Sequence, residues 1–240
     1  LDLIKSNNTK IERILDIGCG FGGILKLIGE YVHAKELYGI DIDDVAINTA
    51  KLRGIKAIKL NAERGNFPFP SEHFDLVFSL GVLDYFAYWD DIIVEINRIL
   101  KTNGYVLISL PNLASWHNRL ALLFGYQPRD VEVSIRYLCG VHPFYKKRGD
   151  KVVGHIHTIT AYGFKELMEN YGFKTLFLAG VNIITSNKIS RTIRWLLNKI
   201  TYLFGANLSK RFIYLGVKTS STFKSIEEKS WWQRLMDEMQ

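Results

Sequence analysis

Short apolar runs alternate along the chain with segments whose apolar residues recur every three or four positions. The runs are typical of buried strands, and the helical spacing marks one face of an amphipathic helix. Strands that alternate with helices indicate βαβ units and a largely parallel sheet covered by helices. The expected strands are 11–17, 36–40, 56–60, 74–79, 105–110, 173–178 and 211–217, and the expected helices lie near 24–31, 45–52, 92–100, 116–124 and 161–171.

The regular alternation weakens after Pro111, and residues 127–154 form an irregular segment rich in Arg, Lys, His and Tyr. No internal repeat and no linker divides the chain. We therefore expect one domain over 1–220, with elaborations at about 111–154 and 181–210, followed by a helical C-terminal tail over 221–240. The first residue is Leu1 rather than Met, so we expect an N-terminal piece to be missing.

A glycine-rich loop follows the first strand, in the sequence from Asp16 to Gly23. Glycines there let the backbone turn tightly and let a ligand approach it closely. The pattern G-x-G-x-x-G also fits a dinucleotide site, so a nicotinamide enzyme is one alternative. The charge of Asp16 favours a different ligand, because a pyrophosphate on this loop would lie close to a like charge. A ligand with an ammonium and a sulfonium, as in S-adenosylmethionine (SAM), suits the carboxylate better.

A second carboxylate, Asp41, ends the next strand about 20 residues beyond the glycines. A carboxylate at that point accepts hydrogen bonds from ribose hydroxyls. SAM and nicotinamide cofactors both carry a ribose, so Asp41 does not distinguish them. The alternative is that Asp41, like Asp43 or Asp44, is an N-cap of the following helix.

Together these motifs resemble those of class I SAM-dependent methyltransferases, in the order that the family has them. The likeness covers roughly residues 11–112 and continues more weakly through 154–158 and the helix at 164–173, and it points to the small-molecule, type 11/12-like branch. Asn61 departs from the pattern, because the family often has Asp there; Asn still offers a carbonyl oxygen to an adenine amino group. The matching segments are 16–22, 39–42, 61–63 with 67–70, 74–79 and 100–105.

The resemblance implies a Rossmann-like three-layer αβα sandwich, with a mostly parallel seven-stranded sheet whose last strand is antiparallel. It also implies SAM as the methyl donor and S-adenosylhomocysteine (SAH) as the product. The methionine end would contact Asp16 and the loop backbone, the ribose Asp41, and the adenine the end of the third strand. The implied cofactor residues are Asp16, Gly18, Cys19, Gly20, Gly22, Asp41, Ile42, Asn61, Ala62, Glu63, Ser79 and Gly81.

The acceptor side is marked less clearly, because methyl transfer is an in-line displacement that mainly needs alignment and exclusion of water. A base is needed when the acceptor must lose a proton. His155 and His157, just before the helix near 161, are candidates for that base, and structural hydrogen bonds in a loop are the alternative. Asp84 and Tyr85 are candidate pocket-lining residues, or caps of the next helix. No cluster with metal-ligand spacing is present, so no metal is expected.

Composition bears on the partners of the protein. The net charge of +7 favours anionic neighbours, but no dense Lys/Arg block and no RNA-binding module accompany it, so nucleic acid is not an expected partner. The segment at 193–204 is a basic amphipathic stripe, which suits either a membrane interface or a lid on the sheet. The two cysteines, Cys19 and Cys139, do not suggest a disulfide, which favours a cytoplasmic location, with peripheral membrane contact as an addition.

The sequence therefore predicts a SAM-dependent methyltransferase that acts on oxygen or carbon of a small-molecule or lipid- or sugar-linked acceptor. Two alternatives stay open: a non-catalytic SAM-binding accessory subunit and an RNA methyltransferase. The fourth-strand tip lacks the Pro-Pro-aromatic signature of base N-methylating enzymes, and no Pro-Cys nucleophile follows it, so DNA methylation is disfavoured.

Overall fold

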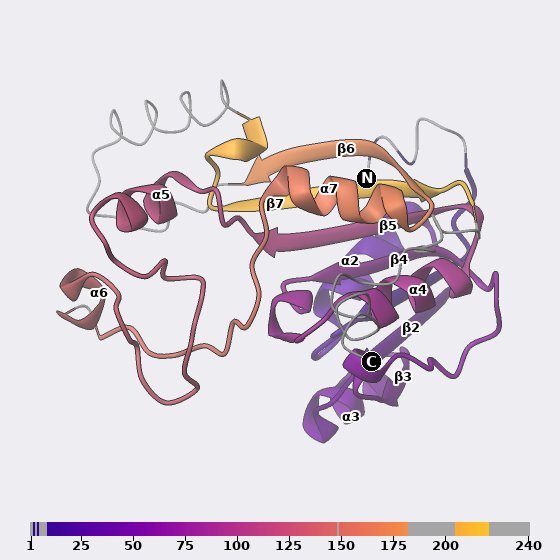
Figure 1. Ribbon diagram of the computed structural model, residues 1–240. Coiled ribbons are helices and arrows are strands. Elements are labelled where there is room, and N and C mark those ends of the chain that lie inside the picture. Colours follow the sequence, from indigo (N-terminus) through magenta and orange to yellow (C-terminus); the bar gives the residue numbers. More distant parts are fainter. Residues whose placement is uncertain (1, 3, 5–8, 148, 182–204, 221–240) are drawn as a thin grey trace, which may run out of the picture.

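The computed structural model describes residues 2, 4, 9–147, 149–181 and 205–220. Within these residues, seven strands form one sheet in the order β3-β2-β1-β4-β5-β7-β6 (Figure 1). Strands β1 to β5 pair in parallel, whereas β7 runs antiparallel to both of its neighbours. The strands are β1 Arg13–Ile17, β2 Glu36–Asp41, β3 Lys56–Lys59, β4 Phe74–Leu80, β5 Leu100–Pro111, β6 Phe173–Val181 and β7 Arg211–Lys218.

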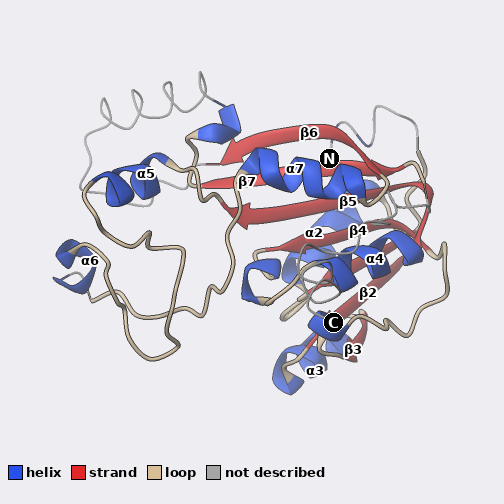
Figure 2. Ribbon diagram, viewed as in Figure 1, coloured by secondary structure: helices blue, strands red, loops and turns tan. Residues whose placement is uncertain are grey.

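Helices cover both faces of this sheet, which confirms the predicted αβα sandwich (Figure 2). Two apolar cores form, one on each face, because successive strand residues point to opposite sides. One core includes Ile96 of α4 and Phe164 of α7, and the other includes Leu25 of α2 and Ile47 of α3. The helices are α2 Gly23–Val32, α3 Asp44–Leu52, α4 Asp90–Ile99, α5 Trp116–Leu123, α6 Pro143–Lys147 and α7 Ala161–Asn170.

Two helix and strand starts differ from the predicted ranges. Helix α4 begins at Asp90, two residues before the predicted start, with Trp89 in the N-cap position and Asp90 and Asp91 in the first turn. The Trp89 side chain is buried and its indole Nε1 donates to the carbonyl oxygen of Leu83, 2.7 Å away, and this contact fixes where the helix begins. Strand β5 begins at Leu100, five residues before the predicted strand 105–110, since Leu100 already pairs with Phe74 ahead of a register shift.

The first elaboration leaves the sheet after β5 and carries α5 and α6 away from the sandwich before the chain reaches α7 (Figure 1). Most of the second elaboration, including the amphipathic stripe at 193–204, lies outside the described residues, as does the tail at 221–240. The proposed boundaries of the domain and its elaborations stay predictions.

Candidate functional site

The glycine loop connects β1 to α2 and bends back over the sheet. Its backbone is tied to β2, since the N–H groups of Gly18 and Cys19 both donate to the carbonyl oxygen of Ile40, at 2.8 and 3.1 Å. Gly18, Gly20 and Gly22 all have positive φ angles, a conformation that residues with a Cβ rarely adopt. A Cβ on Gly18 would stand 2.3 Å from Val82, and one on Gly22 would stand 2.1 Å from Ile55. Only glycine therefore fits at these two positions.

Gly20 differs from these two glycines because, its own chain neighbours apart, no atom of a described residue lies within 4 Å of the place where its Cβ would be. The absence of a side chain at Gly20 is therefore not required by packing inside the described protein. It leaves open space in front of the loop. The N–H of Gly20 donates to the carboxylate Oδ2 of Asp41, 2.8 Å away, which holds the loop against the end of β2. The loop presents bare backbone to whatever occupies that space.

We expect Gly20→Val to abolish SAH binding while the protein still folds. The branched side chain would fill the open space, and its positive φ would cost roughly 1–2 kcal/mol of stability. Isothermal titration with SAH should show at least a hundredfold loss of affinity. Gly54→Val is the matched control, since Gly54 also has a positive φ and an open Cβ position but lies after α3. Normal SAH affinity in a folded Gly20→Val protein would contradict the assignment of the loop.

Asp16 lies near the end of β1, with 4% of its surface exposed. It accepts no hydrogen bond from any described residue. Burial, together with the nearby Asp41 carboxylate, raises the pKa of Asp16 well above its ordinary value. A buried carboxylate with no donor is costly unless a ligand supplies one, so the site is complementary to a cationic group with N–H donors.

Asp41 stands at the end of β2, where its carboxylate also accepts the N–H of Asp43 at 3.0 Å. It is not the N-cap of α3, because Asp43 fills that role and accepts the N–H of Ala46 at 2.8 Å. Asp41 is therefore held at the edge of the loop rather than used in capping. The neighbouring Ile42 is 66% exposed, and its contact with a ligand stays a prediction.

The adenine candidates follow β3, and two of them are engaged in local structure. The Asn61 Oδ1 accepts the N–H of Glu63 at 3.1 Å and so caps the 3₁₀ turn Ala62–Arg64. The Glu63 Oε1 accepts the N–H of Ala87 at 2.7 Å, which joins this turn to the loop after β4. Ala62 is buried. A contact of Asn61 or Glu63 with adenine would have to share these oxygens, and it stays a prediction.

Cys19 faces away from the open side of the loop, because its Sγ lies 2.6 Å from the place of a Cβ on Gly39. Burial raises the pKa of this thiol to about 12, so it stays protonated. Only its backbone is in a position to serve a ligand. Ser79 is fully buried and its hydroxyl donates to the carbonyl oxygen of Ile17 at 3.0 Å. Ser79 therefore joins the ends of β4 and β1 and shapes the floor of the site.

The fourth-strand tip brings an acid and a histidine together. Asp84 lies in the 3₁₀ turn Leu83–Tyr85, fully buried, with its Oδ2 3.1 Å from the Nε2 of His155. The carbonyl oxygen of Asp84 accepts the N–H groups of Ile156 and His157, at 2.8 and 3.2 Å, so the segment that carries His155 is pinned to the turn. The ring of Tyr85 packs edge-on against that of His155, with centroids 5.3 Å apart.

This pair has unused hydrogen-bonding capacity. Neither carboxylate oxygen of Asp84 accepts a well-aligned hydrogen bond from another described residue, and the buried Nδ1 of His155 has no partner there. Burial raises the pKa of Asp84, and the charges of His155 and Arg211 oppose that rise. Buried polar atoms without partners cost free energy. Such atoms are typical of a site that binds a polar ligand or water.

His157 takes a different position from His155. It is exposed and its ring packs beside those of Tyr88 and Trp89, with centroids 6.4 and 6.3 Å away. Of the two predicted bases, the structure therefore brings only His155 to a carboxylate. Asp84 does not cap α4, since Trp89 holds the N-cap position there.

Sequence reasoning missed two features of this region. Arg211 begins β7, and its Nη2 lies 2.9 Å from the place of a Cβ on Gly81, at the end of β4. Asp130, from the irregular segment, is buried with its Oδ2 3.0 Å from the Nε2 of His117. No periodicity marks either contact, because each joins segments far apart in the sequence. Among the described residues, no group of three or more His, Cys, Asp or Glu side chains is arranged to hold a metal.

Comparison with known proteins decides the family. The profile of a methyltransferase domain family matches residues 2–177. The chain belongs to this methyltransferase domain family. Phthiotriol/phenolphthiotriol dimycocerosates methyltransferase of Mycobacterium tuberculosis is 24% identical over 165 residues, which are 65% of this chain and 60% of that protein. A fatty-acid O-methyltransferase of Mycolicibacterium smegmatis is 27% identical over 100 residues, 40% of this chain and 36% of its own.

Solved methyltransferase structures share the fold. A SAM-dependent methyltransferase from Methanosarcina mazei superposes with a TM-score of 0.58 at 20% identity, covering 91% of this chain and 97% of its own. One from Archaeoglobus fulgidus gives a TM-score of 0.55 at 18% identity, covering 90% and 92%. The chain thus carries a methyltransferase domain with the fold of class I SAM-dependent methyltransferases, as its motifs predicted. It spans 60% of the length of the mycobacterial relative.

Proposed function

We propose that the protein transfers the methyl group of SAM to a hydroxyl group of a lipid-like acceptor, with His155 as the general base and Asp84 as the residue that positions it. SAM supplies a methyl group bound to a cationic sulfur. The buried pair of Asp84 and His155, at the tip of β4 and beside the glycine loop, is the observation that carries the proposal.

The residues of the loop fit SAM. The buried carboxylate of Asp16, which accepts no hydrogen bond from the described residues, suits the ammonium group of the methionine part of SAM. The open space before Gly20 admits a ligand to the backbone. Asp41, already turned toward the loop, has the position expected of a ribose acceptor. A pyrophosphate on the same loop would lie against Asp16, which disfavours the nicotinamide alternative.

The pair of Asp84 and His155 indicates the kind of acceptor. In the tautomer that carries its hydrogen on Nε2, 3.1 Å from the Oδ2 of Asp84, the lone pair of the imidazole is on Nδ1, and we assign to Nδ1 the uptake of the hydroxyl proton. A carboxylate acceptor needs no base at neutral pH. It would also bring a second negative charge toward the buried Asp84. The site therefore favours a hydroxyl over a fatty-acid carboxylate.

The relatives support a lipid-like acceptor. Both curated relatives reported above are named for methylation of lipids. The segment that matches the family profile, residues 2–177, includes the loop and the tip of β4. The exposed apolar residues of the first elaboration, such as Leu123 and Phe124, agree with such an acceptor. Low identity leaves the particular lipid open.

A labelling assay tests the proposal. The purified protein is incubated with tritiated SAM and, separately, a long-chain alcohol, a phenolic lipid, a free fatty acid and total RNA. We expect label in the hydroxylated lipids, at least tenfold more than in the fatty acid, and none in RNA. Label only in RNA or only in the fatty acid would contradict it. SAH binding without turnover of any acceptor, together with a co-purifying enzyme, would instead favour the accessory-subunit alternative.

A further inference from the structure

The first elaboration carries a segment that we call the basic arm, residues 126–153, between α5 and the His155 segment. It lies outside the sandwich and includes α6 (Figure 1). A hydrogen bond within the arm gives it a defined shape, since the N–H of Gln127 donates to the carbonyl oxygen of Gly140 at 2.9 Å. A second hydrogen bond leaves the arm: the N–H of Glu132 donates to the carbonyl oxygen of His155 at 3.1 Å. The arm is thus joined directly to the pair of Asp84 and His155, which we call the acceptor pair.

The acidic residues of the arm point inward. Asp130 pairs with His117, and Glu132 with Arg129, at 3.0 and 2.5 Å, and these carboxylate side chains are only 10% and 5% exposed. The carboxylate of Glu132 also accepts the N–H groups of Val153 and Gly154. Asp150, 14% exposed, lies 3.8 Å from Arg129. Every acid of the arm is therefore buried or nearly so and engaged in contacts with neighbouring described residues.

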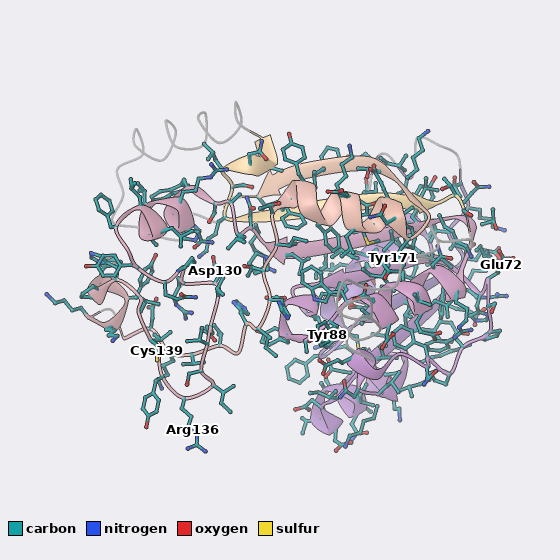
Figure 3. The ribbon with its side chains drawn as sticks, viewed as in Figure 1. Glu72, Tyr88, Asp130, Arg136, Cys139 and Tyr171 are labelled. Atoms are coloured by element: carbon teal, nitrogen blue, oxygen red, sulfur yellow. The ribbon has the colours of Figure 1, made fainter. Side chains whose placement is uncertain are left out.

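The exposed side chains of the arm, which together we call its outer face, have the opposite composition. Val133, Ile135, Tyr137 and Phe144 are 71, 83, 71 and 57% exposed. Arg136 lies between Ile135 and Tyr137 in the sequence. Figure 3 shows its side chain at the outer end of the loop, pointing away from the body of the protein. The other exposed basic residues of the described part of the arm are Lys146, Lys147 and Lys151.

Exposed apolar and aromatic side chains interleaved with cations, on a face without exposed acids, are complementary to one kind of surface. Anionic headgroups attract the cations, while the apolar side chains enter the interface between headgroups and acyl chains. We propose that the outer face of the basic arm docks on an anionic lipid bilayer. Because the arm is joined to His155, docking would hold the acceptor pair beside the membrane. The docking itself requires no methyl transfer, so it can be tested apart from the proposed function.

Vesicle sedimentation tests the proposal with the full chain. Vesicles of phosphatidylcholine alone are compared with vesicles that contain about one-third phosphatidylglycerol. We expect the protein to sediment with the anionic vesicles at least tenfold more strongly, and the difference to shrink as salt is raised, because salt screens exposed charges. Equal binding to both kinds of vesicle, or to neither, would overturn the proposal.

Two pairs of substitutions locate the docking face. Arg136→Glu with Lys147→Glu reverses two outer charges and should weaken binding by at least tenfold, since each basic residue near an anionic surface contributes roughly a fivefold factor. Ile135→Ser with Tyr137→Ser should weaken it by a similar factor. Lys26→Glu with Lys51→Glu is the matched control, because these exposed residues of α2 and α3 give the same change of charge away from the arm. Equal losses in the control and the arm variants would refute the arm as the docking face.

Other occupants of the face give distinct results. A dimer in light scattering that becomes a monomer in the Ile135→Ser, Tyr137→Ser protein, without vesicle binding, would assign the face to a second copy and overturn the proposal. Salt-sensitive binding of RNA without vesicle binding would also overturn it. Unchanged SAH affinity in all variants confirms that the sandwich still folds.

Discussion

Asp16→Asn is expected to weaken SAH binding by on the order of a hundredfold, about 3 kcal/mol, and at the same time to make the free protein more stable at neutral pH. The loss of affinity follows because the amide cannot form a charge-assisted contact with the ammonium group of the ligand. The gain in stability follows because the wild-type carboxylate is buried without a donor from the described residues, close to Asp41. Calorimetric titration and thermal unfolding measure the two effects.

The sign of the pH dependence follows from the raised pKa of Asp16. A carboxyl group whose folded pKa is raised contributes stability below its ordinary pKa, and that contribution is lost as the pH rises through the folded value. The amide variant has no such loss, so its advantage in Tm should grow as the pH rises above the ordinary pKa of a carboxyl group. An increase of a few degrees at pH 8 corresponds to on the order of 1 kcal/mol in a domain of this size. SAH affinity of the wild type should rise with pH as Asp16 loses its proton.

Asp75→Asn is the control for this prediction. Asp75 is buried in the same sheet, but its carboxylate accepts the N–H groups of Glu12 and Arg13, at 2.9 and 2.8 Å, and pairs with Lys101. The substitution should therefore lower stability by about 1–3 kcal/mol and leave SAH affinity nearly unchanged. An Asp16→Asn protein that bound SAH normally, or that was less stable than the wild type at pH 8, would refute the role given to Asp16.

His155→Gln is expected to lower kcat for a hydroxylated acceptor by roughly 10²–10⁴, with SAH affinity unchanged within about twofold. The glutamine cannot take up a proton at neutral pH, and a positioned base contributes about that factor when the acceptor is a hydroxyl. Asp84→Asn should lower kcat by a smaller factor, since Asp84 positions His155 through the 3.1 Å contact and does not touch the acceptor. The double variant should be no slower than His155→Gln alone, because the two residues act as one unit.

His157→Gln is the matched control for the acceptor pair. It lies two residues away, but it is exposed and packs beside Trp89 rather than against a carboxylate. We expect kcat within about threefold of the wild type. The pH–rate profile separates catalysis from structure, because loss of a base removes the fall in rate at low pH, whereas a structural defect lowers the whole curve. A kcat of His155→Gln within a few-fold of the wild type would contradict the role of this residue.

The donor side of the site follows from local sequence. The glycine spacing after β1 dictates a turn that only glycine adopts, as the positive φ angles and the tight spaces at Gly18 and Gly22 show. Asp16 and Asp41 end two strands that pair in parallel, with Asp16 aligned to Gly39 and Ile17 to Ile40, so their carboxylates share one edge of the sheet. Hydrophobic periodicity and short connections were enough to predict where Asp16, the glycine loop and Asp41 lie, because all three belong to the single unit β1-α2-β2.

Only the tertiary structure decided the acceptor side. The pairing of Asp84 with His155 depends on a long, irregular segment that returns to the tip of β4, and no periodicity predicts where such a segment lies. Arg211 reaches Gly81 because β7 inserts antiparallel beside β5, a register that depends on packing of the whole sheet. The buried acids and exposed cations of the basic arm likewise depend on the position that this long segment takes in the folded protein. The local sequence determines how neighbouring strands and helices pair and pack. The position of a long loop is decided by the complete fold, because only contacts with the rest of the protein balance the entropy lost when the loop is ordered.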